Sequence, residues 1–104
     1  MKVMTEETFG PVVGVAPFDT TEDAIAAAND TQYGLAAIVY TSNLNTAHKA
    51  AMEIRAGNVS INNPDPGVIN APYGGWQDSG FGCEHGPEGL MEYMRAKHIR
   101  TRYI

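Results

Sequence analysis

The sequence is poor in cysteine and in long apolar runs. Cys83 is the one cysteine in 104 residues, which excludes an intrachain disulfide and the structural zinc sites that need several thiolates. A reducing compartment is expected, and therefore a cytoplasmic protein. No stretch approaches the length of a membrane span, and no secretory signal pattern opens the chain. No membrane partner is expected.

Positive charge is also scarce. Lysine and arginine together number 7 against 12 acidic residues, for a formal net charge of −5. A net negative charge repels the phosphate backbones of nucleic acids, so no nucleic-acid partner is expected. The basic residues gather near the C-terminus, while acids dominate the beginning of the chain, and this asymmetry favours contacts with protein.

What is present is an alternation of β-rich runs and helical patterns. The run 12–18 predicts a strand, and the hydroxyls and acids of 19–23 predict the start of a helix. A second strand is expected over 35–40, and a strand over 58–62 follows a second helix. Asn43 or Asn45 is expected to cap that helix, and Gly57 to end it in a left-handed conformation. Alternating elements predict an α/β fold with a mostly parallel sheet and flanking helices.

A long connection between residues 62 and 86 is rich in Asn, Pro, Gly and Asp and shows little periodicity. Connections of this length are usually functional or are held in place by a larger fold. After it, Pro87 begins a short predicted helix, and 99–104 interleaves apolar and basic residues as a final strand. The search for a functional site therefore centres on the long connection.

Four short blocks occur in one order along the chain. They are Glu7-Thr8-Phe9-Gly10-Pro11-Val12, Tyr33-Gly34-Leu35-Ala36-Ala37, Pro72-Tyr73-Gly74-Gly75 and Ser79-Gly80-Phe81-Gly82. With them the sequence resembles the C-terminal part of the catalytic domain of the aldehyde dehydrogenase superfamily. The resemblance implies a complete enzyme that oxidises an aldehyde to a carboxylic acid with NAD or NADP. It also implies that 1–92 belong to the catalytic domain and that 93–104 form an oligomerisation strand, so a homo-oligomer is expected.

The resemblance implies no catalytic residue in this chain. In that family the cysteine nucleophile, the glutamate that activates water and the Rossmann-type domain lie upstream of the first block. This chain alone is therefore expected to be inactive. The alternative is a stand-alone, self-associating interaction module without catalytic activity. A thiol enzyme built on Cys83 and His85 is disfavoured, because the family usually has arginine at the position of Cys83 and nothing else nearby would lower the thiol pKa.

The resemblance also implies cofactor and substrate contacts at the positions of this sequence that match the family's motifs. Glu7 matches the glutamate that accepts hydrogen bonds from the nicotinamide ribose, and Phe9 matches the aromatic beside the nicotinamide. The alternatives are a solvated acid and an ordinary core phenylalanine. Residues 63–71 match the loop of the substrate tunnel, and the predicted substrate-binding residues are Asp65, Gly67, Val68, Ile69 and Tyr73.

Three further features of the sequence bear on the substrate, on ion pairs and on metal binding. Tyr73 stands where the family usually has phenylalanine, so its hydroxyl favours a polar or aromatic aldehyde, unless it simply packs against Trp76. Gln77 and Cys83 stand where the family commonly has lysine and arginine, so the ion pairs of those cations are absent. His48, His85 and His98 share no helical spacing, so they are expected at the surface and no metal site is predicted.

Overall fold

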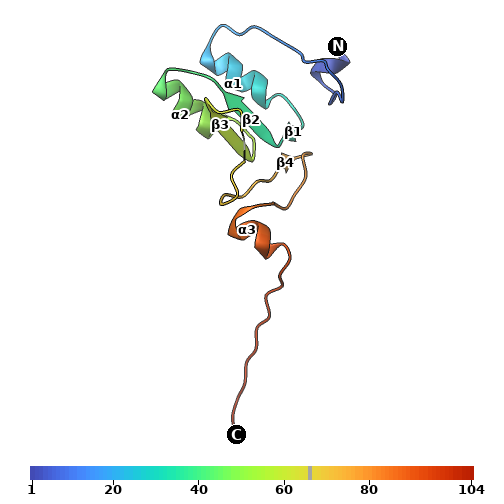
Figure 1. Cartoon of the computed structure of the whole chain (residues 1–104), viewed down its shortest axis with the longest axis vertical. Helices are drawn as coiled ribbons and strands as arrows, with labels where there is room; N and C mark the ends of the chain where they lie inside the picture. Colours follow the sequence, from blue (N-terminus) through green and yellow to red (C-terminus); the bar gives the residue numbers. More distant parts are fainter. Residues whose placement is uncertain (66) are drawn as a thin grey trace.

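The computed structural model describes residues 1–65 and 67–104 (Figure 1). After a 3-10 turn, η1 (Lys2–Met4), the first helix is α1 (Thr21–Asn29). The hydroxyl of Thr20 accepts a hydrogen bond from the Asp23 N–H at 3.1 Å, and the Asp23 carboxylate accepts one from the Thr20 N–H at 3.2 Å. This capping box satisfies two backbone donors that a helix start leaves free. The helix predicted here is confirmed.

The strand predicted over 12–18 is wrong. This segment is extended but pairs with no strand among the described residues, and Val13 and Val15 are exposed. Its β-branched residues favour an extended backbone, but a strand also needs a neighbour for its N–H and C=O groups. That neighbour is not found in the described part of this chain.

A parallel β-α-β unit forms the centre of the molecule. It consists of β2 (Ala36–Val39), α2 (Leu44–Glu53) and β3 (Asn58–Ile61), with Ala36 opposite Asn58 and Val39 opposite Ile61. Asn43, not Asn45, caps α2: its side-chain oxygen accepts from the N–H groups of Asn45 and Thr46 at 2.9 and 3.1 Å. The α/β class and the parallel pairing are confirmed.

Gly57 does not end α2 in a left-handed conformation as predicted. The helix ends at Glu53, with Ile54 as its C-cap. Gly57 instead lies so close to Gly74 that a β-carbon added to it would collide with the Gly74 carbonyl oxygen. Glycine at this position allows the backbone before β3 to approach the long connection.

A second, smaller sheet joins distant parts of the sequence. β1 (Tyr33–Gly34) pairs antiparallel with β4 (Trp76–Gln77). The long connection is tied again by a bridge in which Tyr73 and Glu84 exchange backbone hydrogen bonds of 2.8 Å, and it leads into α3 (Gly86–Met91). The observed sheets are thus small, and one of the two is antiparallel.

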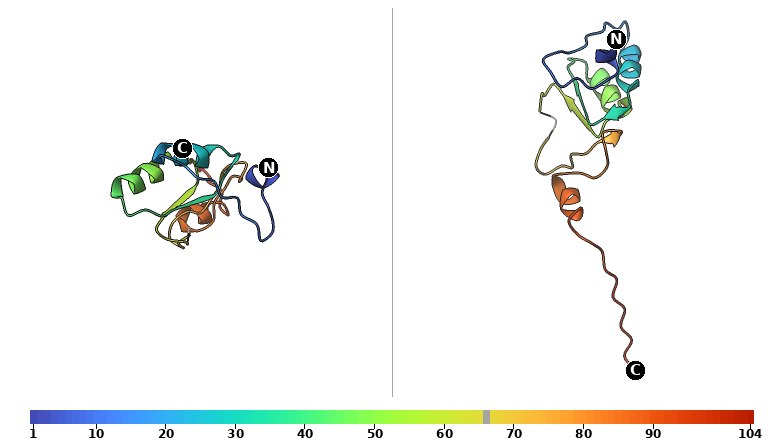
Figure 2. Two further views of the ribbon diagram at one scale, coloured as in Figure 1. Left: turned by 90° about the horizontal axis from the view of Figure 1, so that it is seen from above. Right: turned by 90° about the vertical axis from the view of Figure 1, so that its right-hand side faces the viewer.

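The layers leave much apolar surface uncovered. Helix α1 contacts α2, α2 contacts β3, and both helices lie on the same side of the β2–β3 pair (Figure 2). The buried apolar side chains of the described residues are those of Ile25, Ala50 and Ala56. Ile38, on the other face of β2, is exposed. Parallel sheets are normally covered on both faces, but residues 1–65 and 67–104 supply no second covering layer for this one.

Beyond α3, the chain extends away from the body as a single strand-like tail (Figure 1). Residues 99–104 pair with no strand among the described residues, so the predicted oligomerisation strand stays a prediction. The tail makes the molecule 73 Å long, with a radius of gyration of 18.6 Å, against about 13 Å for a compact domain of this size. No helix in the described part of the chain is long and apolar enough to span a bilayer.

Candidate functional site

Glu7 lines a hollow of about 540 Å³ between the N-terminal segment and the start of the sheets. The hollow is enclosed by residues 3–7, by β1 and the start of β2, and by the chain that follows α2. Its lining includes the apolar side chains of Val3, Met4, Leu35, Ala36 and Ile54. A carboxylate carries two acceptor oxygens, so Glu7 can accept hydrogen bonds from two neighbouring hydroxyls of one ligand.

Glu6, the acid next to Glu7, forms an ion pair within the N-terminal segment. Lys2 Nζ lies 3.3 Å from the Glu6 carboxylate, in an i, i+4 ion pair. No hydrogen bond or ion pair within the described residues engages the Glu7 carboxylate. Of the two acids on this segment, Glu7 is therefore the one whose oxygens are free to meet a ligand.

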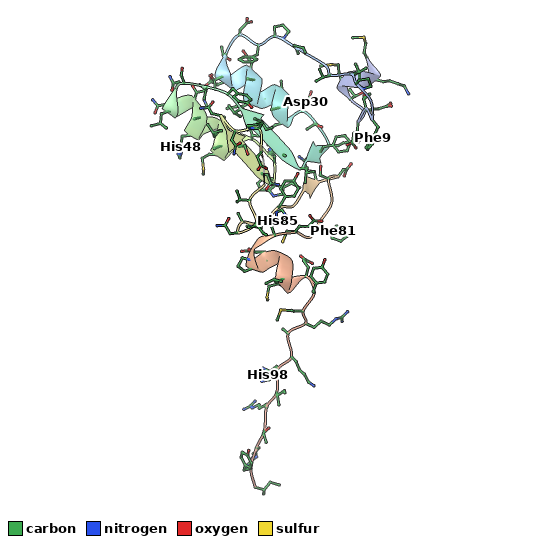
Figure 3. The ribbon with its side chains drawn as sticks, viewed as in Figure 1. Phe9, Asp30, His48, Phe81, His85 and His98 are labelled. Atoms are coloured by element: carbon green, nitrogen blue, oxygen red, sulfur yellow. The ribbon has the colours of Figure 1, made fainter. Side chains whose placement is uncertain are left out.

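Phe9 is not an ordinary core phenylalanine within this chain, because its side chain is 93% exposed. Figure 3 shows it on the N-terminal segment, away from His85. Backbone hydrogen bonds from Gly10 to Thr8 and from Val12 to Gly10, at 3.0 and 2.8 Å, bend the chain at Phe9 and just after it. The structure does not bring Phe9 into the hollow that Glu7 lines.

The predicted substrate loop is organised by its own polar side chains. Asp65 Oδ1 accepts a hydrogen bond from the Gly67 N–H at 3.0 Å, and the Asp65 carbonyl accepts one from Ser60 Oγ at 3.1 Å. The Ala71 N–H donates to the Val68 carbonyl at 3.2 Å. These bonds leave the apolar side chains of Val68 and Ile69 exposed, at 56% and 85%.

Tyr73 lies beside His85, and the alternative, packing against Trp76, is not among the aromatic pairs of the described residues. The two ring centroids are 6.2 Å apart and the planes are tilted by 41°. A β-carbon added to Gly67 would lie 3.8 Å from Tyr73 Cδ2 and 3.9 Å from His85 Cε1. The structure therefore brings together three predicted residues, Asp65, Gly67 and Tyr73, with one that was not predicted.

His85 carries no sequence signal that would single it out. It is exposed, as are His48 and His98, and it lies far along the chain from the loop that it meets. The backbone bridge between Tyr73 and Glu84 brings the Tyr73 and His85 rings together, and this bridge forms only in the tertiary structure. A pattern of local spacing cannot predict it.

A second hollow of about 390 Å³ adjoins the first, since Leu35 and Ser79 line both. Its remaining lining residues are Tyr73, Gly74, Gly75, Phe81, Gly82, Cys83, Glu84 and Glu92. The half-buried Cys83 thiol forms no hydrogen bond with His85 in the described structure, so no thiolate–imidazole pair is assembled. Among residues 1–65 and 67–104, no three His, Cys, Asp or Glu side chains gather as metal ligands would.

Comparison with known proteins agrees with the order of the sequence blocks. A family model described as "Aldehyde dehydrogenase family" matches residues 1–99. Lactaldehyde dehydrogenase of Escherichia coli (strain K12) is 45% identical over 99 residues, which are 95% of this chain and 21% of that protein. Aminoaldehyde dehydrogenase 1, peroxisomal, of Pisum sativum is 45% identical over 103 residues, covering 99% of this chain and 20% of that protein.

Solved structures match in the same way. A crystal structure of betaine aldehyde dehydrogenase from Staphylococcus aureus in complex with NAD+ is similar with a TM-score of 0.91 and 45% identity, over 95% of this chain and 20% of that one. The chain thus spans about a fifth of the length of the relatives it matches. A family match over residues 1–99 and a shared fold at this level of identity lead to one conclusion: the chain belongs to the aldehyde dehydrogenase family.

Proposed function

We propose that this chain forms the C-terminal part of the catalytic domain of an NAD(P)-dependent aldehyde dehydrogenase, which oxidises an aldehyde to a carboxylic acid. In this proposal residues 1–92 belong to the catalytic domain, and 93–104 form an assembly strand. The observation that carries it is the unpaired Glu7 carboxylate on the wall of a hollow, in a chain of this family. A relative from Staphylococcus aureus has been solved with NAD+.

The residues of the hollow fit the ribose end of a nicotinamide cofactor. The free Glu7 carboxylate would hold the two ribose hydroxyls, and the apolar wall formed by Leu35 and Ala36 would exclude water beside them. When bound, the nicotinamide supplies a hydride acceptor. Phe9 lies outside the hollow, and its exposed ring would be available to contact the nicotinamide ring.

The loop and Tyr73 would limit the choice of aldehyde. Val68 and Ile69 present apolar side chains to solvent, and no hydrogen bond in the described structure engages the Tyr73 hydroxyl. A phenol hydroxyl in the same loop as exposed apolar side chains favours a substrate with a polar or aromatic group. The oxygens of Asp65 that remain free would add one acceptor.

The test uses the complete enzyme that carries this segment. Glu7→Gln removes the charge from the ribose contact, and a hydrogen bond to a charged group contributes about 1.5–3 kcal/mol. The expected result is an increase in the KM for the cofactor of roughly tenfold or more. Glu6→Gln is the matched control, because Glu6 lines the same hollow but is paired with Lys2. Equal effects of the two substitutions would reject the role of Glu7.

The chain of 104 residues by itself is proposed to be inactive, because the family's nucleophilic cysteine and its cofactor-binding domain have no match in it. NAD+-dependent oxidation of a panel of small aldehydes should therefore give no turnover. Clear turnover by this chain alone would overturn the proposal and return attention to Cys83.

A self-associating module without activity is the second candidate, and the exposed apolar residues of the tail favour it. Ile99, Tyr103 and Ile104 lie exposed on an unpaired extended segment. Light scattering on the sample used for the activity assay tests it. Association that disappears when 97–104 are deleted would support the assembly strand, and a monomer at all concentrations would reject it.

A cytoplasmic location remains a prediction that rests on the single cysteine. The Pisum sativum relative carries the name peroxisomal. Imaging of a fluorescent fusion of the complete protein distinguishes the two compartments.

A further inference from the structure

His85 has a backbone conformation that is nearly reserved for glycine. Its φ and ψ angles are 60° and 172°, in a region where an L side chain is strained and persists only when the surrounding structure enforces it. Two other non-glycine residues have positive φ, Asn62 at 54° and Gln77 at 53°. A residue kept in a strained conformation, where glycine would fit without cost, is a candidate for a functional role.

The conformation of His85 is enforced from both sides. On one side, Glu84 and Tyr73 exchange two backbone hydrogen bonds of 2.8 Å. On the other, the Gly86 N–H donates to the Ile69 carbonyl at 3.0 Å. His85 therefore lies between two backbone ties: the Tyr73–Glu84 bridge before it and the hydrogen bond from Gly86 to Ile69 after it.

The His85 ring lies beside Tyr73 and near Gly67, at a point where the loop has no side chain. The two ring centroids are 6.2 Å apart, and a β-carbon added to Gly67 would lie 3.8 Å from Tyr73 Cδ2 and 3.9 Å from His85 Cε1. Figure 3 places His85 at the junction between the long connection and α3. Because Gly67 has no side chain, the loop backbone can lie close to these two rings.

We propose that His85 is a positioning residue that holds residues 67–69 against Tyr73 and thereby limits the size of the aldehyde that the enzyme accepts. This inference rests on the proposed function, because it takes 67–69 as a wall of the substrate passage. His85 acts through the loop and does not itself meet the reacting atoms. Besides the Gly86–Ile69 bond, the described ties of this part of the loop are the bonds of Asp65 with Ser60 and Gly67 and the bond from Ala71 to Val68.

The test is His85→Gly in the complete enzyme that carries this segment. The substitution removes the ring and also relieves the backbone strain, so the midpoint of thermal unfolding should stay equal or rise. Amide hydrogen exchange at Gly67 and Ala71, the loop amides bonded to Asp65 Oδ1 and to the Val68 carbonyl, should become faster by about tenfold, because the loop has lost the neighbouring ring. The preference for a short over a bulky branched aldehyde, measured as the ratio of kcat/KM, should fall by about tenfold. The change should lie in the KM for the bulky substrate, with kcat retained.

Gln77→Gly is the matched control, because it also replaces a residue with positive φ, outside the loop. It should leave both the exchange at Gly67 and Ala71 and the aldehyde preference unchanged. His85→Phe, which keeps a ring beside Tyr73, should retain slow exchange and most of the preference.

Unchanged exchange in His85→Gly would overturn the proposal, and so would faster exchange with an unchanged aldehyde preference. If the unsubstituted enzyme oxidises no aldehyde in the panel, the proposed function fails instead. The exchange measurement then still decides whether His85 holds the loop.

Discussion

At the scale of single residues, asparagine side chains hydrogen-bond to the backbone of distant segments and so connect them. In a domain with a larger apolar core, side-chain packing would make these connections. Asn29 donates to the Glu53 carbonyl at 2.9 Å and accepts from the Arg55 N–H at 2.7 Å. Asn62 bonds both the N–H and the carbonyl of Thr41, at 2.9 and 2.8 Å. An amide suits this work because it carries donors and acceptors together.

Asn58 offers a direct test, because it is buried, with 9% of its surface exposed. Its Nδ2 donates to the carbonyl oxygens of Leu35 and Gly74, at 2.9 and 3.2 Å. Asn58→Asp replaces this donor with an acceptor, so it should lower the free energy of unfolding by about 1–3 kcal/mol. Denaturant unfolding of the complete enzyme measures the change. Asn70→Asp, at an exposed position with no side-chain hydrogen bond in the described structure, should change it by less than about 0.5 kcal/mol.

The ion pair between Glu22 and Lys49 predicts how stability depends on pH. It joins α1 to α2 at the surface. The hydrogen bond from Lys49 lowers the pKa of the Glu22 carboxyl, and the same bond raises the pKa of Lys49. The lowered carboxyl pKa means that the stabilisation is present above its ordinary value and is lost as the pH falls through the lowered one. The raised pKa of Lys49 means that the stabilisation is lost only as the pH rises through that raised value.

Glu22→Gln should therefore lower the Tm slightly at neutral pH, and this effect should shrink as the pH falls through the lowered pKa of Glu22. Thermal unfolding over a series of acidic pH values measures this. In a Lys49→Met background the effect of Glu22→Gln at neutral pH should disappear. An effect that persists without Lys49 would show that the carboxylate acts through another group.

At the scale of elements, the β-α-β unit depends on one close backbone contact. Gly57 precedes β3 and lies against the Gly74 carbonyl in the long connection. The next residue, Asn58, bonds that same carbonyl. The loop that carries the candidate substrate residues is thus attached to the sheet at the start of β3.

Gly57→Ala should break this attachment. The added methyl group collides with backbone, which cannot rotate away, so the expected loss of unfolding free energy is about 1–3 kcal/mol or more. Gly10→Ala is the control, because a β-carbon there has no heavy atom within 4 Å. Thermal unfolding of both variants in the complete enzyme gives the comparison. Equal stability of the two would contradict the close contact.

The elements that the sequence predicted correctly are those with local signals. Capping residues Thr20 and Asn43 and the apolar spacing of the two helices predicted α1 and α2, because a helix bonds within itself. The run 12–18 gave an equally strong local signal and was wrong as a strand, because a strand depends on a partner elsewhere. The prediction for Gly57, a left-handed helix end, was also wrong, because this glycine allows the backbone to approach Gly74.

At the scale of the whole molecule, the chain buries too little apolar surface to resemble an independent domain. Its buried apolar residues are one isoleucine and two alanines among the described residues. Side chains that would normally lie in a core, such as Phe18, Ile38 and Leu44, are exposed. A chain of this length is marginal even with a full core.

The isolated chain of 104 residues should therefore bind a dye that reports apolar surface, such as ANS, and unfold over a broad temperature range. The complete enzyme should bind little of the dye and unfold sharply, because the rest of the protein covers these faces. Fluorescence titration and calorimetry of both proteins make the comparison. A sharp, cooperative transition in the isolated chain, with no dye bound, would contradict this expectation.

The sequence by itself determined the family, the α/β class and both principal helices. These follow from ordered blocks, caps and periodicities, which are local properties of the chain. Only the tertiary structure decided that Gly57 meets Gly74, that Tyr73 meets His85 instead of Trp76, and that 12–18 lies unpaired. The physical reason is that backbone pairing and close approach join residues far apart in sequence, and no local pattern encodes which partner each segment meets.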